Sequence, residues 1–339
     1  MKKPGRVLIT ILIILVFIGA VLFGILEFYP QLHDRVQLSA IAGAADWMGQ
    51  IDGDLRLSQI SIPGAHDAAA NDSQLRLLTK CQDQDIAALL RDGFRYLDIR
   101  LGIETVNGKK DLTFYHGFLH CLKGPAPWSG HLTFEDAASV CGAFLQAHPT
   151  ETILFVVKQE HGSEPAAEFE SLLDELIEAS STKAQWLLTD EVPTLHEARG
   201  KIVLFRRYQD DAGLGEKAGI YLDWPSQGNA AKNENDPDVD RITYGDHTLF
   251  VQDRYKYDTE PKWQAFQAAV SKAVQEKTAG DVFINFLSSN GKQLYGHPYG
   301  LAKDLNVRFL NADYEVLPGW TIVDFGNASL AEHIYRMNP

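Results

Sequence analysis

The pattern of hydrophobic and polar residues divides the chain into two parts near residue 27. Residues 7–26 form an apolar run, VLITILIILVFIGAVLFGIL, that contains no charged side chain. Twenty residues at about 1.5 Å per residue match the hydrocarbon thickness of a bilayer. From Trp47 onward, short apolar runs alternate with amphipathic stretches. The pattern therefore predicts a membrane-spanning helix followed by a globular domain.

Basic residues before the apolar run predict its orientation. Lys2, Lys3 and Arg6 place the N-terminus in the cytoplasm by the positive-inside rule. We expect a cytoplasmic basic tail, a transmembrane signal anchor, a linker and a catalytic domain at 1–6, 7–27, 28–44 and 45–339. The alternative is a cleaved signal peptide, although the apolar part of such a peptide is usually only about 7–15 residues long. In both cases the domain lies outside the cytoplasm.

Within the domain, apolar runs predict strands and the intervening amphipathic stretches predict helices. A first strand ends just before His66, and further strands are expected at 94–101, 152–159, 201–208, 219–223, 249–253, 282–287 and 320–325. Helices are expected at 82–92, 134–147, 165–178 and 262–277. Thr133 and Asp136 are placed to cap the second of these helices. This alternation predicts an α/β fold with a parallel sheet, best accommodated as a single (β/α) barrel.

Charge and cysteine content narrow the class of protein. With 31 Lys and Arg against 45 Asp and Glu, the net charge is −14, which argues against a nucleic-acid partner. An anionic substrate would therefore need a local cluster of cationic groups. Cys81, Cys121 and Cys141 lack the spacing of zinc ligands and are expected to be structural, as one disulfide or as buried thiols.

Polar residues gather where the predicted strands end. In (β/α) barrels the chemistry takes place at the carboxyl ends of the strands. The segment SIPGAHDAAA places His66 and Asp67 directly after the first strand. The later strands carry or are followed by Asp98, Arg100, Lys158, Glu160, Arg206, Arg207, Asp253, Arg254, Tyr255 and Asp324. We therefore expect cations and carboxylates to share one mouth of the barrel.

Two histidines in this setting suit the cleavage of a phosphodiester by a neighbouring hydroxyl. His66 follows the first strand, and His116 lies before a glycine at the end of a short aromatic stretch, FYHG. One imidazole can accept the proton of the attacking hydroxyl while the other protonates the leaving oxygen. Carboxylates beside them would fix the tautomers, and an arginine would neutralise the phosphoryl charge.

Four segments resemble a known family when taken together and in order. They are WMGQIDGDLRLSQISIPGAHDAAA, GFRYLDIRLG, FYHGF and PTETILFVVKQE. Together they are similar to the X domain of phosphatidylinositol-specific phospholipase C, in its compact, metal-independent bacterial branch. The segments GKIVLFRRY, QDRY and GWTIVDF extend the similarity over roughly residues 45–330. The resemblance implies a distorted TIM barrel and cleavage of inositol phospholipid to diacylglycerol and 1,2-cyclic inositol phosphate.

The resemblance also implies a role for each catalytic position. His66 matches the general base that deprotonates the inositol 2-hydroxyl, and His116 matches the general acid. Asp67 and Asp98 match carboxylates that orient the arginine and the acid histidine, while Asp324 matches the carboxylate that orients His66. These implied roles agree with the chemistry expected from the residues themselves.

Arg100 stands where calcium-dependent members of the family carry an acidic metal ligand. A guanidinium there supplies a fixed charge, so we expect no metal and no other cofactor. The resemblance places substrate-binding side chains at Lys158, Asp253 and Tyr255. For the basic ligand in FRRY we favour Arg207 over Arg206. The substrate would be phosphatidylinositol or a glycosylated inositol lipid.

One pair of residues departs from the family pattern, and one loop is a candidate for contact with the membrane. Ala65 and Ala68 stand where a hydroxyl residue is common, which removes hydrogen bonds near the catalytic loop and lowers the expected rate. The aromatic loop at 126–131 is a candidate for bilayer contact, but we expect Trp128 to pack against the domain.

Two other functions remain open from the sequence. A metal-dependent glycerophosphodiesterase would need acidic ligands near His66, for which Glu104 and Glu160 are the candidates. A non-catalytic module that binds inositol lipid would not need a proton shuttle, so the presence of His66 and His116 argues against it.

Overall fold

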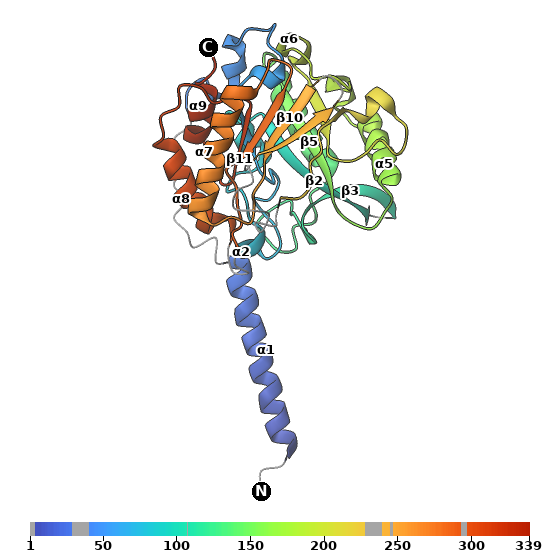
Figure 1. Ribbon diagram of the computed structural model, residues 1–339. Helices are drawn as coiled ribbons and strands as arrows, with labels where there is room; N and C mark the ends of the chain where they lie inside the picture. The colour runs from blue at the N-terminus through green and yellow to red at the C-terminus, as the bar shows by residue number, and fades with distance from the viewer. Residues whose placement is uncertain (1–3, 29–40, 107, 228–238, 245–246, 293–296) are drawn as a thin grey trace.

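The computed structural model describes residues 4–28, 41–106, 108–227, 239–244, 247–292 and 297–339. Helix α1 (Pro4–Phe28) projects from the body of the molecule as a single rod (Figure 1). Its segment Leu8–Phe28 has a mean hydropathy of 3.1 and is long and apolar enough to cross a membrane. Most of the predicted linker, 29–40, lies outside the described residues.

The body is built on a mostly parallel sheet. Its strands are β1 (Ile62–Ala65), β2 (Tyr96–Val106), β3 (Lys109–His116), β4 (Leu119–His120), β5 (Ile153–His161), β6 (Trp186–Leu187), β7 (Ile202–Arg206), β8 (Ile220–Tyr221), β9 (Asp240–Tyr244), β10 (His247–Gln252), β11 (Val282–Phe286) and β12 (Trp320–Val323). They follow the order β6-β7-β5-β2-β1-β12-β11-β10-β9, and β8 pairs with β7. The pairs β9–β10, β2–β3 and β3–β4 are antiparallel.

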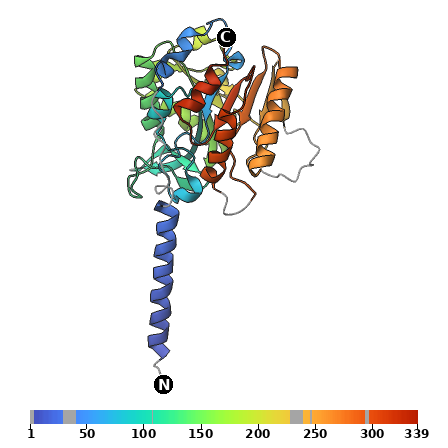
Figure 2. The same ribbon diagram turned by 90° about the vertical axis from the view of Figure 1, so that its left-hand side faces the viewer.

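Helices cover the outer face of this sheet. They are α2 (Arg76–Thr79), α3 (Ile86–Arg91), α4 (Phe134–Ala147), α5 (Ala166–Ala179), α6 (Leu195–Ala198), α7 (Thr259–Glu276), α8 (Pro298–Leu310) and α9 (Ala328–Tyr335). Short 3₁₀ turns occupy Ala44–Gln50, Leu57–Gln59, Lys183–Gln185 and Gly215–Ala218. Figure 2 shows α7, α8 and α9 side by side against one flank of the sheet.

The strands of the barrel wall carry long apolar runs because both of their faces are buried there, as in Ile153–Val157 of β5. In β5, Leu154 and Val156 join the cluster inside the barrel, which includes Trp320. Phe155 and Val157 point the other way, into the cluster beneath the helices. Burying each such side chain contributes about 1.5–3 kcal/mol, so the two clusters together hold the strands in register.

Side chains span the space between β8 and β10, where the described residues show no strand pairing. Trp224 Nε1 donates to Asp253 Oδ2 at 3.0 Å. The amide of Asp253 donates to Gln227 Oε1 at 2.7 Å, and the Tyr244 hydroxyl donates to the Asp223 carbonyl. The barrel is thus distorted, and polar side chains replace a strand ladder on this side.

The predicted α/β barrel is confirmed, and most expected strands coincide with observed ones. Helix α4 has the predicted bounds, and Thr133 and Asp136 form the predicted capping box. The helix expected at 82–92 is shorter, because Asp85 caps it by accepting from the Ala88 amide at 2.8 Å. Strand β9 and helices α8 and α9 were not predicted.

Two smaller predictions are also resolved. All three cysteines are buried free thiols, so the alternative of a disulfide is wrong. Trp128 is 85% exposed, so the expectation that it packs against the domain is wrong as well.

Candidate active site

His66 and Asp324 meet because β1 and β12 are neighbouring parallel strands. Ala65 is in register with Val323, so the residues that follow the two strands emerge side by side. His66 Nδ1 lies 2.7 Å from Asp324 Oδ1. The Gln82 side chain donates to the carbonyls of His66 and Val323 and so holds both strand ends together.

Arg100 lies within β2, where this strand leaves the barrel, and is surrounded by acceptors. Its Nη2 lies 3.0 Å from Asp98 Oδ2 and 2.9 Å from His66 Nε2. Its Nε lies 3.3 Å from Asp67 Oδ1, and its Nη1 lies 3.4 Å from Glu160 Oε1. Burial opposes the charge, but these three carboxylates outweigh it and hold the pKa of Arg100 above its usual range. The guanidinium is therefore a permanent cation.

Asp67 adopts a backbone conformation that is rare for a residue with a side chain. Its φ is 43°, in the left-handed region. Asp98 stabilises this turn, since its Oδ2 accepts from the Asp67 amide at 3.3 Å and its carbonyl from the Ala68 amide at 3.0 Å. The turn sends the Asp67 carboxylate between Arg100 and His116. Burial raises the pKa of Asp67 and outweighs the attraction of Arg100.

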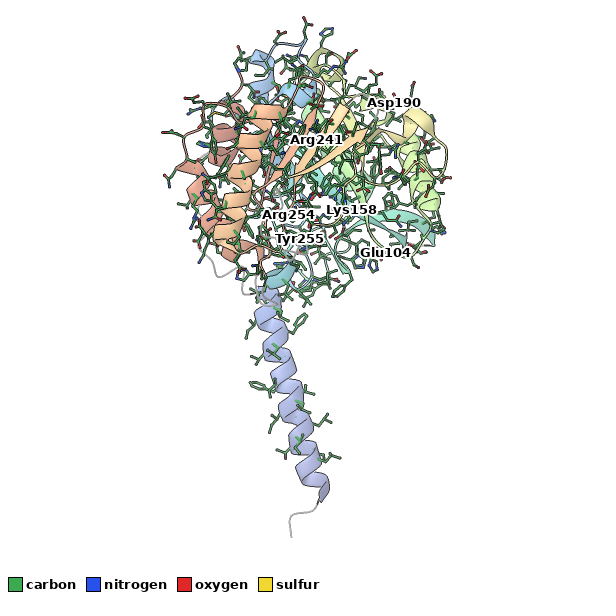
Figure 3. All side chains as sticks on the ribbon, in the orientation of Figure 1. Glu104, Lys158, Asp190, Arg241, Arg254 and Tyr255 are labelled. Carbon is green, nitrogen blue, oxygen red and sulfur yellow. The ribbon has the colours of Figure 1, made fainter. Side chains whose placement is uncertain are left out.

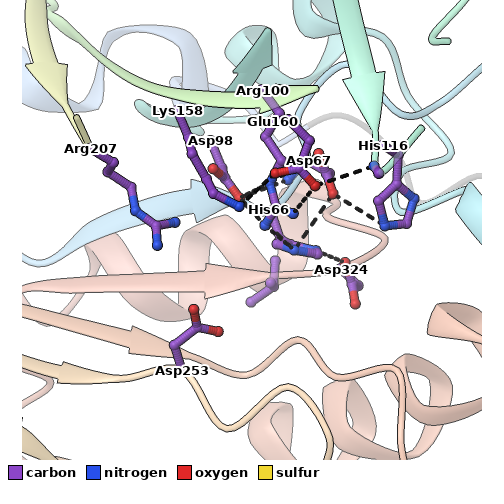
Figure 4. Close-up of polar contacts among 12 residues, drawn as sticks. His66, Asp67, Asp98, Arg100, His116, Lys158, Glu160, Arg207, Asp253 and Asp324 are labelled. Atoms are coloured by element: carbon purple, nitrogen blue, oxygen red, sulfur yellow. Dashed lines mark hydrogen bonds and ion pairs between the residues drawn. The ribbon is translucent and has the colours of Figure 1, made fainter. Parts of the chain in front are cut away.

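His116 ends β3 and faces the same cleft as His66 (Figure 4). Its Nδ1 lies 2.8 Å from the carbonyl of Thr79 in α2. Since a carbonyl only accepts, Nδ1 carries a proton and Nε2 is left for the cleft. Asp67 Oδ2 lies 3.6 Å from that Nε2.

Opposing effects set the pKa of His66. Burial favours the neutral ring, but the Asp324 carboxylate outweighs it and raises the pKa to about 9. Arg100 opposes protonation as well, and its contact with Nε2 requires the lone pair of the neutral ring. Any group that draws Arg100 away from Nε2 therefore increases the basicity of His66.

Beside these groups lies a cleft with a volume of about 400 Å³. Among the residues lining it are His66, Arg100, His116, Lys158, Glu160, Arg207, Trp224, Ser226, Asp253, Tyr255 and Asp324. Asp67 and Asp98 are buried beneath its floor. The structure thus brings all the residues predicted for catalysis and substrate binding to one place.

Arg206 and Arg207 take different positions. The Arg207 guanidinium lies 3.4 Å above the centre of the Trp224 ring and lines the cleft. Arg206 turns away and donates to the carbonyls of Gly219 and Tyr208. The placement therefore agrees with the preference for Arg207.

Several cleft residues were not predicted as site residues. Glu160 joins Arg100 to Lys158, whose Nζ lies 2.6 Å from its Oε2, and accepts from the Gly117 amide at 3.2 Å. Burial alone would raise the pKa of Glu160, but Arg100 and Lys158 lower it to about 2. Glu160 was expected at this mouth without a catalytic or binding role, and the lining residues that were not predicted at all include Asp223, Trp224, Ser226, Ser288, Ser289 and Asn290. Residues 288–290 follow β11, so they could have been predicted from the tendency of site residues to lie at the carboxyl ends of barrel strands.

Neither carboxylate considered as a ligand of a catalytic metal offers a metal site within the cleft. Glu160 is paired with Arg100 and Lys158. Glu104 lies outside the residues lining the cleft and pairs with His131 at 2.8 Å. This arrangement does not favour a metal-dependent glycerophosphodiesterase.

Comparison with known proteins points to one family. Residues 55–208 match the X domain of phosphatidylinositol-specific phospholipase C. A 1-phosphatidylinositol phosphodiesterase of Staphylococcus aureus is 28% identical over 338 residues, which cover 96% of this chain and 94% of the relative. Residues 55–208 thus match the X domain of this family, and the chain over nearly its whole length is similar to a bacterial phosphatidylinositol phosphodiesterase. A 1-phosphatidylinositol phosphodiesterase of Listeria monocytogenes is 24% identical over 307 residues, covering 86% and 84% of the two chains.

Solved structures of the family share the fold. A mutant phosphatidylinositol-specific phospholipase C of Staphylococcus aureus superposes with a TM-score of 0.72 at 24% identity, covering 87% of this chain and 97% of that one. The Listeria monocytogenes enzyme gives 0.63 at 20% identity, with 87% and 99% covered. A further Staphylococcus aureus structure, which concerns modulation of membrane binding, gives 0.70 at 24% identity, with 87% and 98% covered.

Proposed function

We propose that this chain is a phosphatidylinositol phosphodiesterase that releases diacylglycerol and 1,2-cyclic inositol phosphate. The observation that carries the proposal is the placement of two histidines, each oriented by its own partner, with Arg100 in the same cleft. Two proton-transfer groups and a fixed cation are what an intramolecular attack on a phosphodiester requires. The activity by which the curated relatives are named supports the same reaction.

The reaction forms one bond to phosphorus and breaks another. His66 accepts the proton of the inositol 2-hydroxyl at Nε2, and the freed oxygen attacks the adjacent phosphorus. The bond from phosphorus to the glycerol oxygen breaks, and His116 donates a proton from Nε2 to that oxygen. Asp324 stabilises the imidazolium formed at His66, while Asp67 stabilises the protonated His116 before transfer.

Arg100 supplies positive charge to the phosphoryl oxygens. In the structure its Nη2 is directed at His66 Nε2. A bound phosphate would compete for that donor, which would leave the His66 lone pair available to the 2-hydroxyl. Asp98 and Asp67 hold the guanidinium in place during this exchange.

The other side of the cleft suits a polyhydroxylated ring. Lys158 and Arg207 offer donors, and Asp253 is an acceptor fixed by Trp224. Tyr255 presents an aromatic ring whose hydroxyl pairs with Ser226 at 2.8 Å. We assign these four side chains to inositol binding, in phosphatidylinositol or in a glycosylated inositol lipid.

Product analysis tests this function directly. The full chain in detergent would be incubated with phosphatidylinositol in mixed micelles with excess chelator, and the water-soluble product followed by phosphorus NMR. We expect a cyclic phosphodiester resonance, which His66→Gln and His116→Gln should abolish while circular dichroism shows them folded. Activity that appears only when calcium is restored would overturn the role of Arg100. No product under either condition would favour a lipid-binding module.

We infer further that α1 anchors the domain to the membrane in a single pass, with the domain outside the cytoplasm. Glu27, near the C-terminal end of α1, accepts from the Leu75 amide at 2.9 Å and lies 3.6 Å from Arg76 Nε. These partners belong to α2 and its N-cap, and the same helix supplies the Thr79 carbonyl that fixes His116. In Figure 3, Lys158 and Tyr255 lie in the half of the body nearer to α1.

Two exposed aromatic side chains are consistent with this orientation. Phe118, 73% exposed, lies in the turn directly after His116. Trp128 is on the loop whose Pro125 carbonyl accepts from Arg76. The inference is tested by the mass of the mature N-terminus and by extraction at alkaline pH. A chain that begins beyond residue 28 and is released into the soluble fraction would support a cleaved signal peptide instead.

A further inference from the structure

Outside the cleft, one carboxylate and two imidazoles converge on a single point. Glu104 belongs to β2, His120 to β4, and His131 pairs with Leu122 in an isolated bridge. His131 Nδ1 lies 2.8 Å from Glu104 Oε2, and His120 Nδ1 lies 3.8 Å from the same oxygen. One ligand atom from each of the three residues lies within 4.8 Å of the other two.

The contact of the second histidine with Glu104, at 3.8 Å, is too long for a hydrogen bond and does not by itself explain why His120 lies here. The His131–Glu104 pair is already complete at 2.8 Å. The His120 ring nevertheless stacks on His131 with 3.5 Å between ring centres, and its buried Nδ1 has no hydrogen-bond partner among the described residues. A polar atom held in this way costs free energy unless a further group binds to it.

We propose that Glu104, His120 and His131 bind a divalent cation of borderline softness, with zinc the best match, at a site separate from the catalytic cleft. Two imidazole nitrogens and one carboxylate are a common zinc-ligand set that leaves a fourth position for water. Zinc bonds of about 2.0–2.1 Å place tetrahedral ligand atoms roughly 3.3 Å apart. The observed separations of 2.8 and 3.8 Å fall on either side of that value, and the two rings, which are stacked 10° from parallel, must rotate apart so that both nitrogen lone pairs point at the ion.

Access and proton balance are also compatible with a cation. The three side chains are between 19% and 31% exposed, so an ion can reach them from solvent. On binding, His131 Nδ1 gives up the proton that it donates to Glu104 and the neutral ring instead carries its proton on Nε2, through exchange with solvent, so that the carboxylate and two neutral rings become the ligands. The site thus exchanges a hydrogen bond for metal–ligand bonds without a change in oxidation state.

Occupancy would stabilise one particular unit of the fold. β3 pairs with β2 on one side and with β4 on the other. A cation bound by Glu104 of β2 and His120 of β4 would therefore link the two outer strands of this three-stranded unit across β3. The same unit ends in His116. Binding to the folded state alone raises the unfolding temperature in proportion to the logarithm of free metal over Kd. The inference does not rest on the proposed function, because the hydrolysis assay in excess chelator is independent of this site.

The test is a metal titration of the tag-free full chain in detergent. We expect one zinc ion per chain after dialysis against zinc chloride, and a higher unfolding temperature with zinc than with chelator. His120→Asn and His131→Asn should each weaken zinc binding at least tenfold. His148→Asn is the matched control, because His148 pairs with Asp46 at 2.7 Å in a similar contact that involves one histidine. Unchanged binding in the His120 and His131 variants would overturn the proposal.

A cobalt spectrum of the wild-type chain decides the matter even where a variant fails to fold. We expect visible bands of tetrahedral cobalt without a thiolate charge-transfer band. A thiolate band would instead place the ion with Cys81, His66 and Asp67, the other group of potential ligands in the described residues, and would overturn the assignment. The absence of tetrahedral bands at saturating cobalt would do the same.

Discussion

At the scale of single residues, Arg100 carries the positive charge that the proposed reaction needs. We expect Arg100→Lys to reduce kcat by about 10²–10³, or roughly 2.7–4 kcal/mol in barrier, because an ammonium cannot serve the phosphate and both aspartates together. Steady-state kinetics on a micellar substrate measures this loss. An activity within threefold of wild type would show that a positive charge is sufficient for catalysis without the planar set of donors of a guanidinium.

Asp324 provides the prediction for pH. It holds the pKa of His66 at about 9, so the base is protonated below that pH and kcat/KM should rise as pH increases toward it. Asp324→Asn removes the cause that raises the pKa, so the ascending limb should move to lower pH. The maximal rate should fall as well, since the imidazolium loses its stabilising partner. A profile whose ascending limb stays in place would exclude His66 as the group that it reports.

The neighbouring arginines offer a matched pair. Arg207→Ala should lower kcat/KM by about 10–100-fold, mainly through KM, because a charged hydrogen bond contributes about 1.5–3 kcal/mol. Arg206→Ala should instead lower the unfolding temperature, since that side chain binds two carbonyls of the fold. If the two variants exchanged these phenotypes, the assignment of Arg207 to the cleft would be wrong.

At the scale of elements, the cap of α4 is a stabilising feature remote from the cleft. Thr133 and Asp136 satisfy each other's backbone amides. We expect Thr133→Ala to cost about 0.5–2 kcal/mol in the free energy of unfolding and to leave kcat unchanged. Denaturant unfolding of the folded domain measures the first quantity. A loss of activity at full stability would indicate that α4 influences the site.

The elements also show what the sequence could and could not predict. Strands buried on both faces contain continuous apolar runs, and the polar residues that follow these runs led to the prediction of His66, Arg100, Lys158 and Asp253. Beyond Leu101, however, β2 leaves the barrel and pairs with β3 in a more exposed hairpin, so the prediction ended it too early.

Cleft residues in irregular segments could not be predicted from the sequence, because such segments have no hydrophobic periodicity. Trp224 and Ser226 lie in the coil after β8, where no periodicity marks their positions. The pairing of Glu104 with His131 depends on how β2, β3 and β4 fold back on one another. That arrangement is set by tertiary hydrogen bonds between separate segments of the chain, so local composition does not predict it.

At the scale of the whole molecule, removal of α1 should affect only the encounter with lipid. A chain beginning at residue 41 should lose most of its activity on phosphatidylinositol in vesicles and retain its activity on a water-soluble inositol phosphodiester. The two substrates differ in whether the enzyme must find a surface first. Equal losses on both would mean that the contact of Glu27 with α2 also supports the fold.

The contact between α1 and α2 has a consequence for kinetics. An enzyme anchored in a bilayer by α1, as we propose, would meet its substrate by lateral diffusion within a plane and would not dissociate between turnovers. Its rate would then depend on the mole fraction of inositol lipid in its own bilayer and would be insensitive to the total amount of membrane. Each molecule would deplete the patch of lipid around it, and further turnover would wait on the supply of fresh lipid from the rest of that leaflet.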